Sequence, residues 1–64
     1  MIQVGDMVKK ATISSLYNGV GVVVRVIEHD EHTGNLYDMY VVEWLQISGQ
    51  YPYSETELTL VSRA

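Results

Sequence analysis

Five polar side chains that could bind a metal or carry a proton stand together in the segment Glu28-His29-Asp30-Glu31-His32. Imidazole nitrogens and carboxylate oxygens are ligands that zinc and other divalent cations accept. Successive residues of a strand point to opposite faces, so His29 and His32 converge only if a loop bends them together. We therefore expect a solvated loop and no cofactor. His29 and His32 remain the candidates for a metal site or for a contact that responds to pH.

Tyrosines form the second group of residues that could hold a ligand. Aromatic rings in small β-domains bind methylated cations or stack on bases, although tyrosine is also an ordinary packing residue there. Tyr17 lies in a polar loop and Tyr51 and Tyr53 lie in a short hairpin, and we expect these segments to be neighbours. The candidate aromatic rim is therefore Tyr17, Tyr51 and Tyr53, while ordinary packing is the favoured interpretation.

Catalytic chemistry is not indicated by any motif. The chain has no cysteine that could act as a nucleophile. It has serine, histidine and acidic residues, but not in the order and strand-to-helix context of a catalytic triad. Gly19 and Gly21 lead into a predicted strand, whereas the phosphate-binding glycine fingerprint needs a helix at that point. We expect no enzyme activity.

The charge balance argues against nucleic-acid binding as the main function. Eight acidic residues against four basic ones give a net charge of -4. Proteins that bind a phosphate backbone usually gather lysine and arginine on one face. Lys9 and Lys10 are the only adjacent basic residues. Nucleic-acid binding through Lys9, Lys10 and the rim tyrosines is therefore the alternative to binding a protein.

The length of 64 residues indicates one domain, spanning 1–64, with a small core. A domain of this size buries only about 60% of the surface of its unfolded chain. Without cysteine, the expected reinforcement is sheet closure or self-association into a homo-oligomer. Because no segment approaches about 18 apolar residues, we expect a soluble, cytoplasmic protein without a membrane span.

The apolar residues predict an all-β chain, because valine, isoleucine and tyrosine dominate and no helical spacing is present. Pro52 suits an edge strand, since it has no N–H to donate. Ser54 and Glu57 have the spacing of a capping box around a single helical turn. The predicted strands are 6–11, 20–29, 40–45, 50–53 and 58–62.

Arg25 and Glu43 indicate which face of each central strand meets water. By alternation, the residues predicted to face the core are Val20, Val22, Val24, Val26, Tyr40, Val42 and Trp44. Two residues that lie directly opposite each other on the two strands share a face, so their residue numbers must add up to an even value. A sum of 68 makes Thr33-Gly34-Asn35 the loop and sets Arg25 opposite Glu43; a sum of 66 is the competing register.

The same alternation turns large apolar side chains outward around the Arg25 and Glu43 pair. Apolar patches on a solvent-exposed face usually indicate contact with another protein. The sequence therefore predicts an interface with a protein partner or a second copy. Its residues are Val23, Ile27, Val41, Leu45, Arg25 and Glu43.

Several segments together resemble small SH3-like barrels with the Tudor-like and KOW-like pattern. They are the opening Gly5-Asp6-Met7-Val8, the glycine-rich entry at 19–23, the Tyr-x-Val-x-Trp strand at 40–44, and Leu58 with Val61. The resemblance covers nearly the whole chain and implies a five-stranded SH3-like barrel with a short 3-10 turn before the last strand. The chain is also similar to small proteins encoded by bacteriophages and bacteria. That similarity implies a phage origin and a non-enzymatic interaction or structural role.

Overall fold

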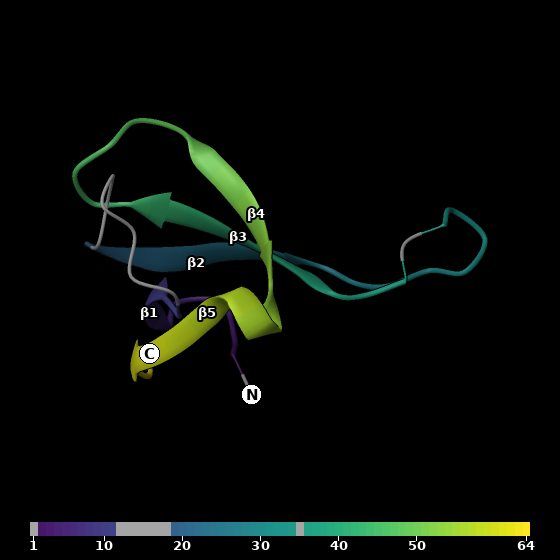
Figure 1. Cartoon of the computed structure of the whole chain (residues 1–64), viewed down its shortest axis with the longest axis horizontal. Helices are drawn as coiled ribbons and strands as arrows, with labels where there is room; N and C mark the ends of the chain where they lie inside the picture. Colours follow the sequence, from purple (N-terminus) through teal and green to yellow (C-terminus); the bar gives the residue numbers. More distant parts are fainter. Residues whose placement is uncertain (1, 12–18, 35) are drawn as a thin grey trace.

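The computed structural model describes residues 2–11, 19–34 and 36–64 of the chain. These residues form one five-stranded antiparallel sheet in the order β4-β3-β2-β1-β5 (Figure 1). The elements are β1 (Met7–Lys10), β2 (Val20–Ile27), β3 (Met39–Trp44), β4 (Gln50–Ser54), the 3-10 helix η1 (Glu55–Glu57) and β5 (Leu58–Ser62). The all-β prediction is confirmed. Within the described ranges no ladder joins the edge strands β4 and β5, so the sheet is not closed.

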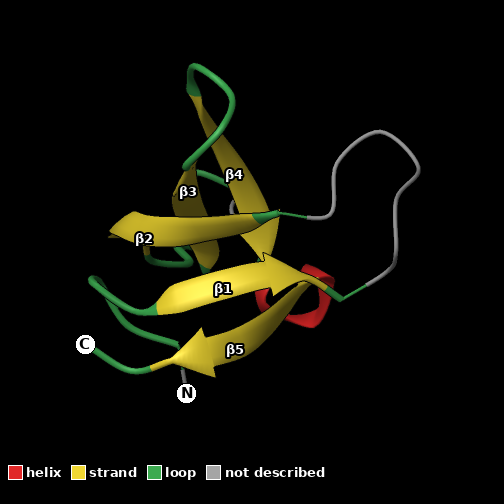
Figure 2. Cartoon of the chain, turned by 90° about the vertical axis from the view of Figure 1, so that its left-hand side faces the viewer, coloured by secondary structure: helices red, strands yellow, loops and turns green. Residues whose placement is uncertain are grey.

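The sheet curves strongly, so that β3 and β4 run steeply across the direction of β1 and β5 (Figure 2). This curvature brings apolar side chains from both halves of the sheet into one core. Trp44 is 3% exposed, and its indole N–H donates to the hydroxyl of Tyr53 at 3.1 Å. The core residues are Ile2, Val8, Val23, Tyr40, Val42, Trp44 and Leu58. The inward positions predicted for Tyr40, Val42 and Trp44 are confirmed.

The pairing of β2 with β3 contains a bulge at Val24, and the predicted register, with a sum of 68, is wrong on both sides of it. Before the bulge Val22 lies opposite Glu43, and after it Arg25 lies opposite Val41. The predicted pair of Arg25 with Glu43 therefore does not form across the ladder. The competing register, with a sum of 66, holds only from Arg25 to Ile27. A bulge inserts one extra residue into one strand, so no single register can describe this ladder.

The bulge also changes which valines face the core. Val23, predicted to point outward, is fully buried in the core. Val41, also predicted outward, is 5% exposed and is buried outside the core cluster. Val26 packs against the core as predicted. The other valines predicted inside are only half-buried and stand outside the core cluster: Val20, Val22 and Val24.

The β2–β3 hairpin projects from the body of the molecule (Figure 1). Its ladder ends where Ile27 lies opposite Met39, so the connection is longer than the predicted loop at 33–35. The Thr33 N–H donates to the Asp30 carbonyl at 3.2 Å, and this hydrogen bond closes a turn. Gly34 has φ +84°, a left-handed conformation that glycine adopts without a steric penalty. Asn35 lies outside the described residues.

The corner between β4 and β5 follows the sequence prediction closely. Pro52 lies in β4, an edge strand, as expected for a residue without an N–H. The Ser54 N–H donates to the Glu57 carboxylate at 2.9 Å, which is the reach-back contact of the predicted capping box. The N–H and the hydroxyl of Ser54 hold the pKa of Glu57 below its usual range. The contact therefore fixes the start of η1.

Asp6 is a buried carboxylate that fastens the two ends of the chain. It is 2% exposed and accepts the Gln3 N–H at 2.8 Å and the Ala64 N–H at 3.0 Å. These two N–H groups, the Ala64 contact first, hold the pKa of Asp6 below its usual range. The Val23 N–H also donates to the Asp6 carbonyl at 3.0 Å, which ties this turn to β2. The Gly5-Asp6 pair is therefore a structural clamp.

Replacing Asp6 with asparagine is expected to lower the melting temperature at neutral pH by about 5–10 °C, because one acceptor oxygen becomes a donor that faces an N–H. A carboxyl group with a depressed pKa stabilises the folded state above its unfolded pKa and loses that contribution as pH falls through its folded pKa. The difference between wild type and Asp6→Asn should therefore shrink on acidification. Thermal melts followed by circular dichroism at several pH values measure it. A constant difference down to strongly acidic pH would contradict this role.

Candidate functional site

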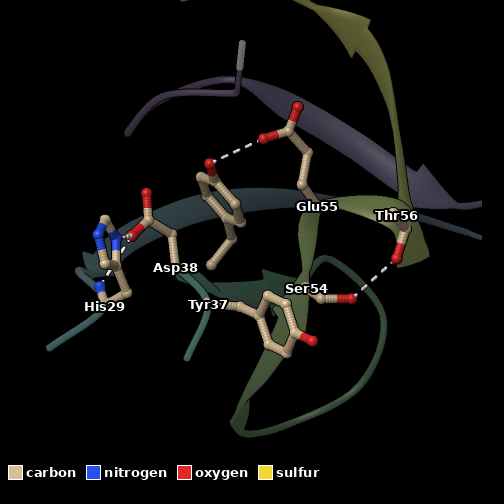
Figure 3. Close-up of a pocket in the computed structure, with 7 residues that line it drawn as sticks. His29, Tyr37, Asp38, Ser54, Glu55 and Thr56 are labelled. Carbon is tan, nitrogen blue, oxygen red and sulfur yellow. Dashed lines mark hydrogen bonds and ion pairs between the residues drawn. The ribbon is translucent and has the colours of Figure 1, made fainter. Parts of the chain in front are cut away.

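An open hollow of ≈ 590 Å³ lies where the base of the β2–β3 hairpin meets the corner between β4 and η1 (Figure 3). Its two walls come from segments far apart in the sequence, which the pairing of β3 with β4 brings together. The lining residues are His29, Tyr37, Asp38, Tyr40, Ser54, Glu55 and Thr56. The hollow combines carboxylates, phenol rings and hydroxyls in one place.

His29 and Asp38 close the hairpin side of the hollow. Asp38 Oδ1 lies 2.8 Å from His29 Nδ1 and accepts the His29 backbone N–H at 2.8 Å. The side-chain contact with Asp38 raises the pKa of His29. The backbone N–H of His29, and then its ring, lower the pKa of Asp38. This pair joins the two arms of the hairpin just beyond the end of the ladder, and it orients the imidazole.

Tyr40 and Glu55 connect the floor of the hollow to η1. The Tyr40 hydroxyl donates to Glu55 Oε2 at 3.1 Å, while the Tyr40 residue is 3% exposed. Burial, followed by the neighbouring Glu55 carboxylate, raises the pKa of Tyr40. The hydroxyl therefore stays protonated at neutral pH and continues to donate. This bond holds the Glu55 side chain against the β3 side of the hollow.

Ser54 shares the hollow with a histidine and an aspartate, which is the composition of a catalytic triad. A triad requires the serine hydroxyl to lie within hydrogen-bond reach of the imidazole. Here the Ser54 hydroxyl donates to Glu57 at 3.0 Å and lies 3.1 Å from the Thr56 hydroxyl. In Figure 3 it points toward Thr56 and away from His29. The arrangement orients a histidine without giving it a nucleophile.

The predicted metal ligands are not brought together. His29 binds Asp38, and His32 is exposed with its backbone N–H bonded to Asp30 Oδ1 at 2.9 Å. In residues 2–11, 19–34 and 36–64, no three or more histidine, aspartate or glutamate side chains are grouped to hold a metal ion.

The predicted aromatic rim is seen only in part. Tyr53 packs its ring edge-on against Trp44, with centroids 5.6 Å apart, and Lys10 Nζ lies 5.6 Å from the Tyr53 centroid. Tyr51 is 45% exposed, and its hydroxyl donates to the Ser48 carbonyl at 3.3 Å. Tyr17 lies outside the described residues. Tyr53 thus takes part in core packing, and Tyr51 in the turn before β4.

The predicted outer-face interface loses its apolar centre. Val23 and Val41 are buried, so they offer no side chain to a partner. Leu45 is 64% exposed, as predicted, and Ile27 is half-buried. The charged residues of the set, Arg25 and Glu43, are both exposed. The large apolar side chains that this face still exposes are therefore fewer than predicted.

Sequence reasoning missed the residues that make the hollow. His29 was predicted as a candidate for a metal site or a contact that responds to pH, Tyr40 as a core residue and Ser54 as a helix cap, but none was predicted to line a common hollow. Asp38 and Glu55 stand apart in the sequence, and each looks like an ordinary loop or helix-start residue. The one usable signal was the capping-box spacing, which places Glu55 in the first turn of η1.

Comparisons of the chain with family models, with curated proteins and with solved structures gave no match. The part of the chain that the structure describes has no helix with the length and apolarity of a membrane span. The functional assignment therefore rests on the geometry of the hollow.

Proposed function

We propose that this protein is a small, non-enzymatic interaction module with the arrangement of an SH3-like barrel, and that it binds a protein partner at the hollow. The order of its elements supports the barrel: a long central hairpin, a shorter second hairpin, a 3-10 turn and a closing strand. The observation that carries the binding function is the exposed aromatic and acidic hollow. Tyr37 at its rim is 71% exposed.

An exposed tyrosine beside carboxylates is better suited to binding than to chemistry. Tyrosine is enriched where proteins bind each other, because its ring supplies contact area and its hydroxyl supplies a hydrogen bond. The Ser54 hydroxyl is engaged by Glu57, which argues for a structural role of that residue. Self-association through the outer face of β2 and β3 has little support, since Val23 and Val41 are buried.

A variant in which a large side chain fills the hollow tests whether the hollow is the binding site. A random peptide library is selected against the wild-type protein, and the enriched peptides are measured against Thr56→Trp, which places a large ring at the exposed rim. Thr59→Trp is the matched control, since Thr59 is exposed on β5 and does not line the hollow. Circular dichroism confirms that both variants fold.

The peptides are expected to bind wild type and Thr59→Trp alike and to lose at least about tenfold in affinity for Thr56→Trp, as for a blocked contact centre. Failure to enrich any peptide would contradict the proposal. Equal binding to Thr56→Trp would contradict it as well.

A further inference from the structure

The residues that line the hollow also indicate which chemical group of a partner it binds. This inference rests on the proposed function. We propose that the hollow receives one positively charged side chain, a lysine ammonium or an arginine guanidinium, from a basic segment of the partner. Carboxylate oxygens open to a ligand, an exposed aromatic ring and the absence of a competing lysine or arginine among the described lining residues carry the inference.

Each carboxylate of the hollow has one oxygen left for a ligand. Among the described contacts, Asp38 uses Oδ1 for His29, and Glu55 uses Oε2 for Tyr40. An ionised carboxylate accepts about four hydrogen bonds, so Asp38 Oδ2 and Glu55 Oε1 keep their full capacity for a donor. Both carboxylates are held in place by these contacts, so binding a cation does not have to order them.

The aromatic walls add attraction for the same kind of ligand. Tyrosine rings attract a cation that lies within about 6 Å of the ring centroid. Tyr37 is 71% exposed at the rim, whereas Tyr40 is 3% exposed and forms the floor. A side chain with an apolar stem and a charged end matches this combination of rings and carboxylates. A small anion or an uncharged apolar side chain does not.

The charge of the whole chain favours the same partner. The net charge is -4, and no lysine or arginine belongs to the lining residues that the structure describes. His29 is paired with Asp38 and stands 64% exposed at the edge. A basic segment is therefore attracted over a distance and meets no opposing lysine or arginine in the described lining.

An organic cation fits better than a metal ion. Calcium takes six or more oxygen ligands, and magnesium requires nearly ideal octahedral geometry. The described residues hold no group of three or more metal-ligating side chains. An ammonium or guanidinium brings its own N–H donors and can bind carboxylate oxygens and an aromatic face without a fixed coordination geometry.

The test uses two small probes that differ only in charge. N-acetyl-arginine amide carries the guanidinium, and N-acetyl-citrulline amide is its neutral analogue of the same shape. Each is titrated into isotopically labelled wild-type protein while the backbone amide resonances are followed. The arginine probe should shift resonances at 37–40 and 54–56 with a dissociation constant on the order of 1–10 mM. The citrulline probe should leave them unchanged.

Charge-removing variants locate the effect. Asp38→Asn and Glu55→Gln each keep an acceptor oxygen, and each should weaken arginine binding roughly threefold to fivefold, as expected for an exposed ion pair. Glu31→Gln is the control, because it removes the same charge from the exposed hairpin outside the hollow. It should leave binding unchanged.

Equal shifts with citrulline, or an equal loss with Glu31→Gln, would overturn the cation assignment. Library peptides that bind the hollow while the arginine probe does not would overturn the cation assignment and leave the proposed function standing. If neither the peptides nor the probe binds, both proposals fall.

Discussion

Replacing Trp44 with alanine is expected to remove a large share of the protein's free energy of unfolding. Truncating a buried tryptophan to alanine costs about 3–5 kcal/mol. A domain of 64 residues has a total stability of only about 3–10 kcal/mol. Trp44 also donates the indole hydrogen bond to Tyr53 and packs edge-on against its ring. Urea denaturation followed by far-ultraviolet circular dichroism measures the loss.

Leu45 supplies the control for this experiment. It follows Trp44 in the chain but is 64% exposed, so Leu45→Ala should change the unfolding free energy by no more than about 0.5 kcal/mol. Similar losses for the two variants would mean that β3 does not face the core as described.

Replacing Gly21 with alanine is expected to cost about 2–3 kcal/mol, because the core has no room for even one more carbon atom. A Cβ at this position would lie 2.5 Å from Val42 Cγ1, 2.7 Å from Trp44 Cε3 and 3.1 Å from the Glu43 carbonyl oxygen. Two of these neighbours are core side chains, so the strands must move apart to accept it. Urea denaturation measures the change in unfolding free energy.

Gly34→Ala is the matched comparison for Gly21→Ala. Gly34 has φ +84°, and nothing lies within 4 Å of an added Cβ. Its expected cost is only the left-handed backbone penalty of about 1–2 kcal/mol. Gly21→Ala should therefore be the more damaging of the two variants, and the reverse order would contradict the close packing of β2 on β3.

The core-facing residues of the third strand could be predicted from sequence because their signals agree, whereas Val41 of the same strand was predicted to face outward and is buried. Glu43 faces water, the neighbouring Tyr40, Val42 and Trp44 alternate with it, and the structure places all three in the core. Pro52 and the Ser54 to Glu57 spacing were equally local signals, and each depends on the residue's own backbone chemistry. Such features are determined by a few adjacent residues, so the sequence alone is enough to predict them.

The second strand could not be predicted in the same way. Val20, Val22, Val23, Val24 and Val26 are nearly identical in chemistry, so alternation could be counted only from Arg25. Arg25 is exposed as expected, but the bulge at Val24 reverses the count on its N-terminal side. A run of valines does not show where a bulge lies, because the bulge depends on packing across the sheet.

The hollow was unpredictable for a related reason. Its central contact joins Tyr40 to Glu55, and neither residue carries a local signal for the other. The pairing of β3 with β4 sets Tyr40 opposite Tyr53, which brings the start of η1 alongside the hairpin base. Sites of this kind follow from strand order and register, which must be known first.

Mapping a library-selected peptide onto the protein by nuclear magnetic resonance tests the hollow as the binding site most directly. The largest amide shifts are expected at 37–40 and 54–56, the segments that line the hollow. The residues of β1 and β5 should change little. The largest shifts on β1 and β5, with none at the hairpin base, would contradict the binding site.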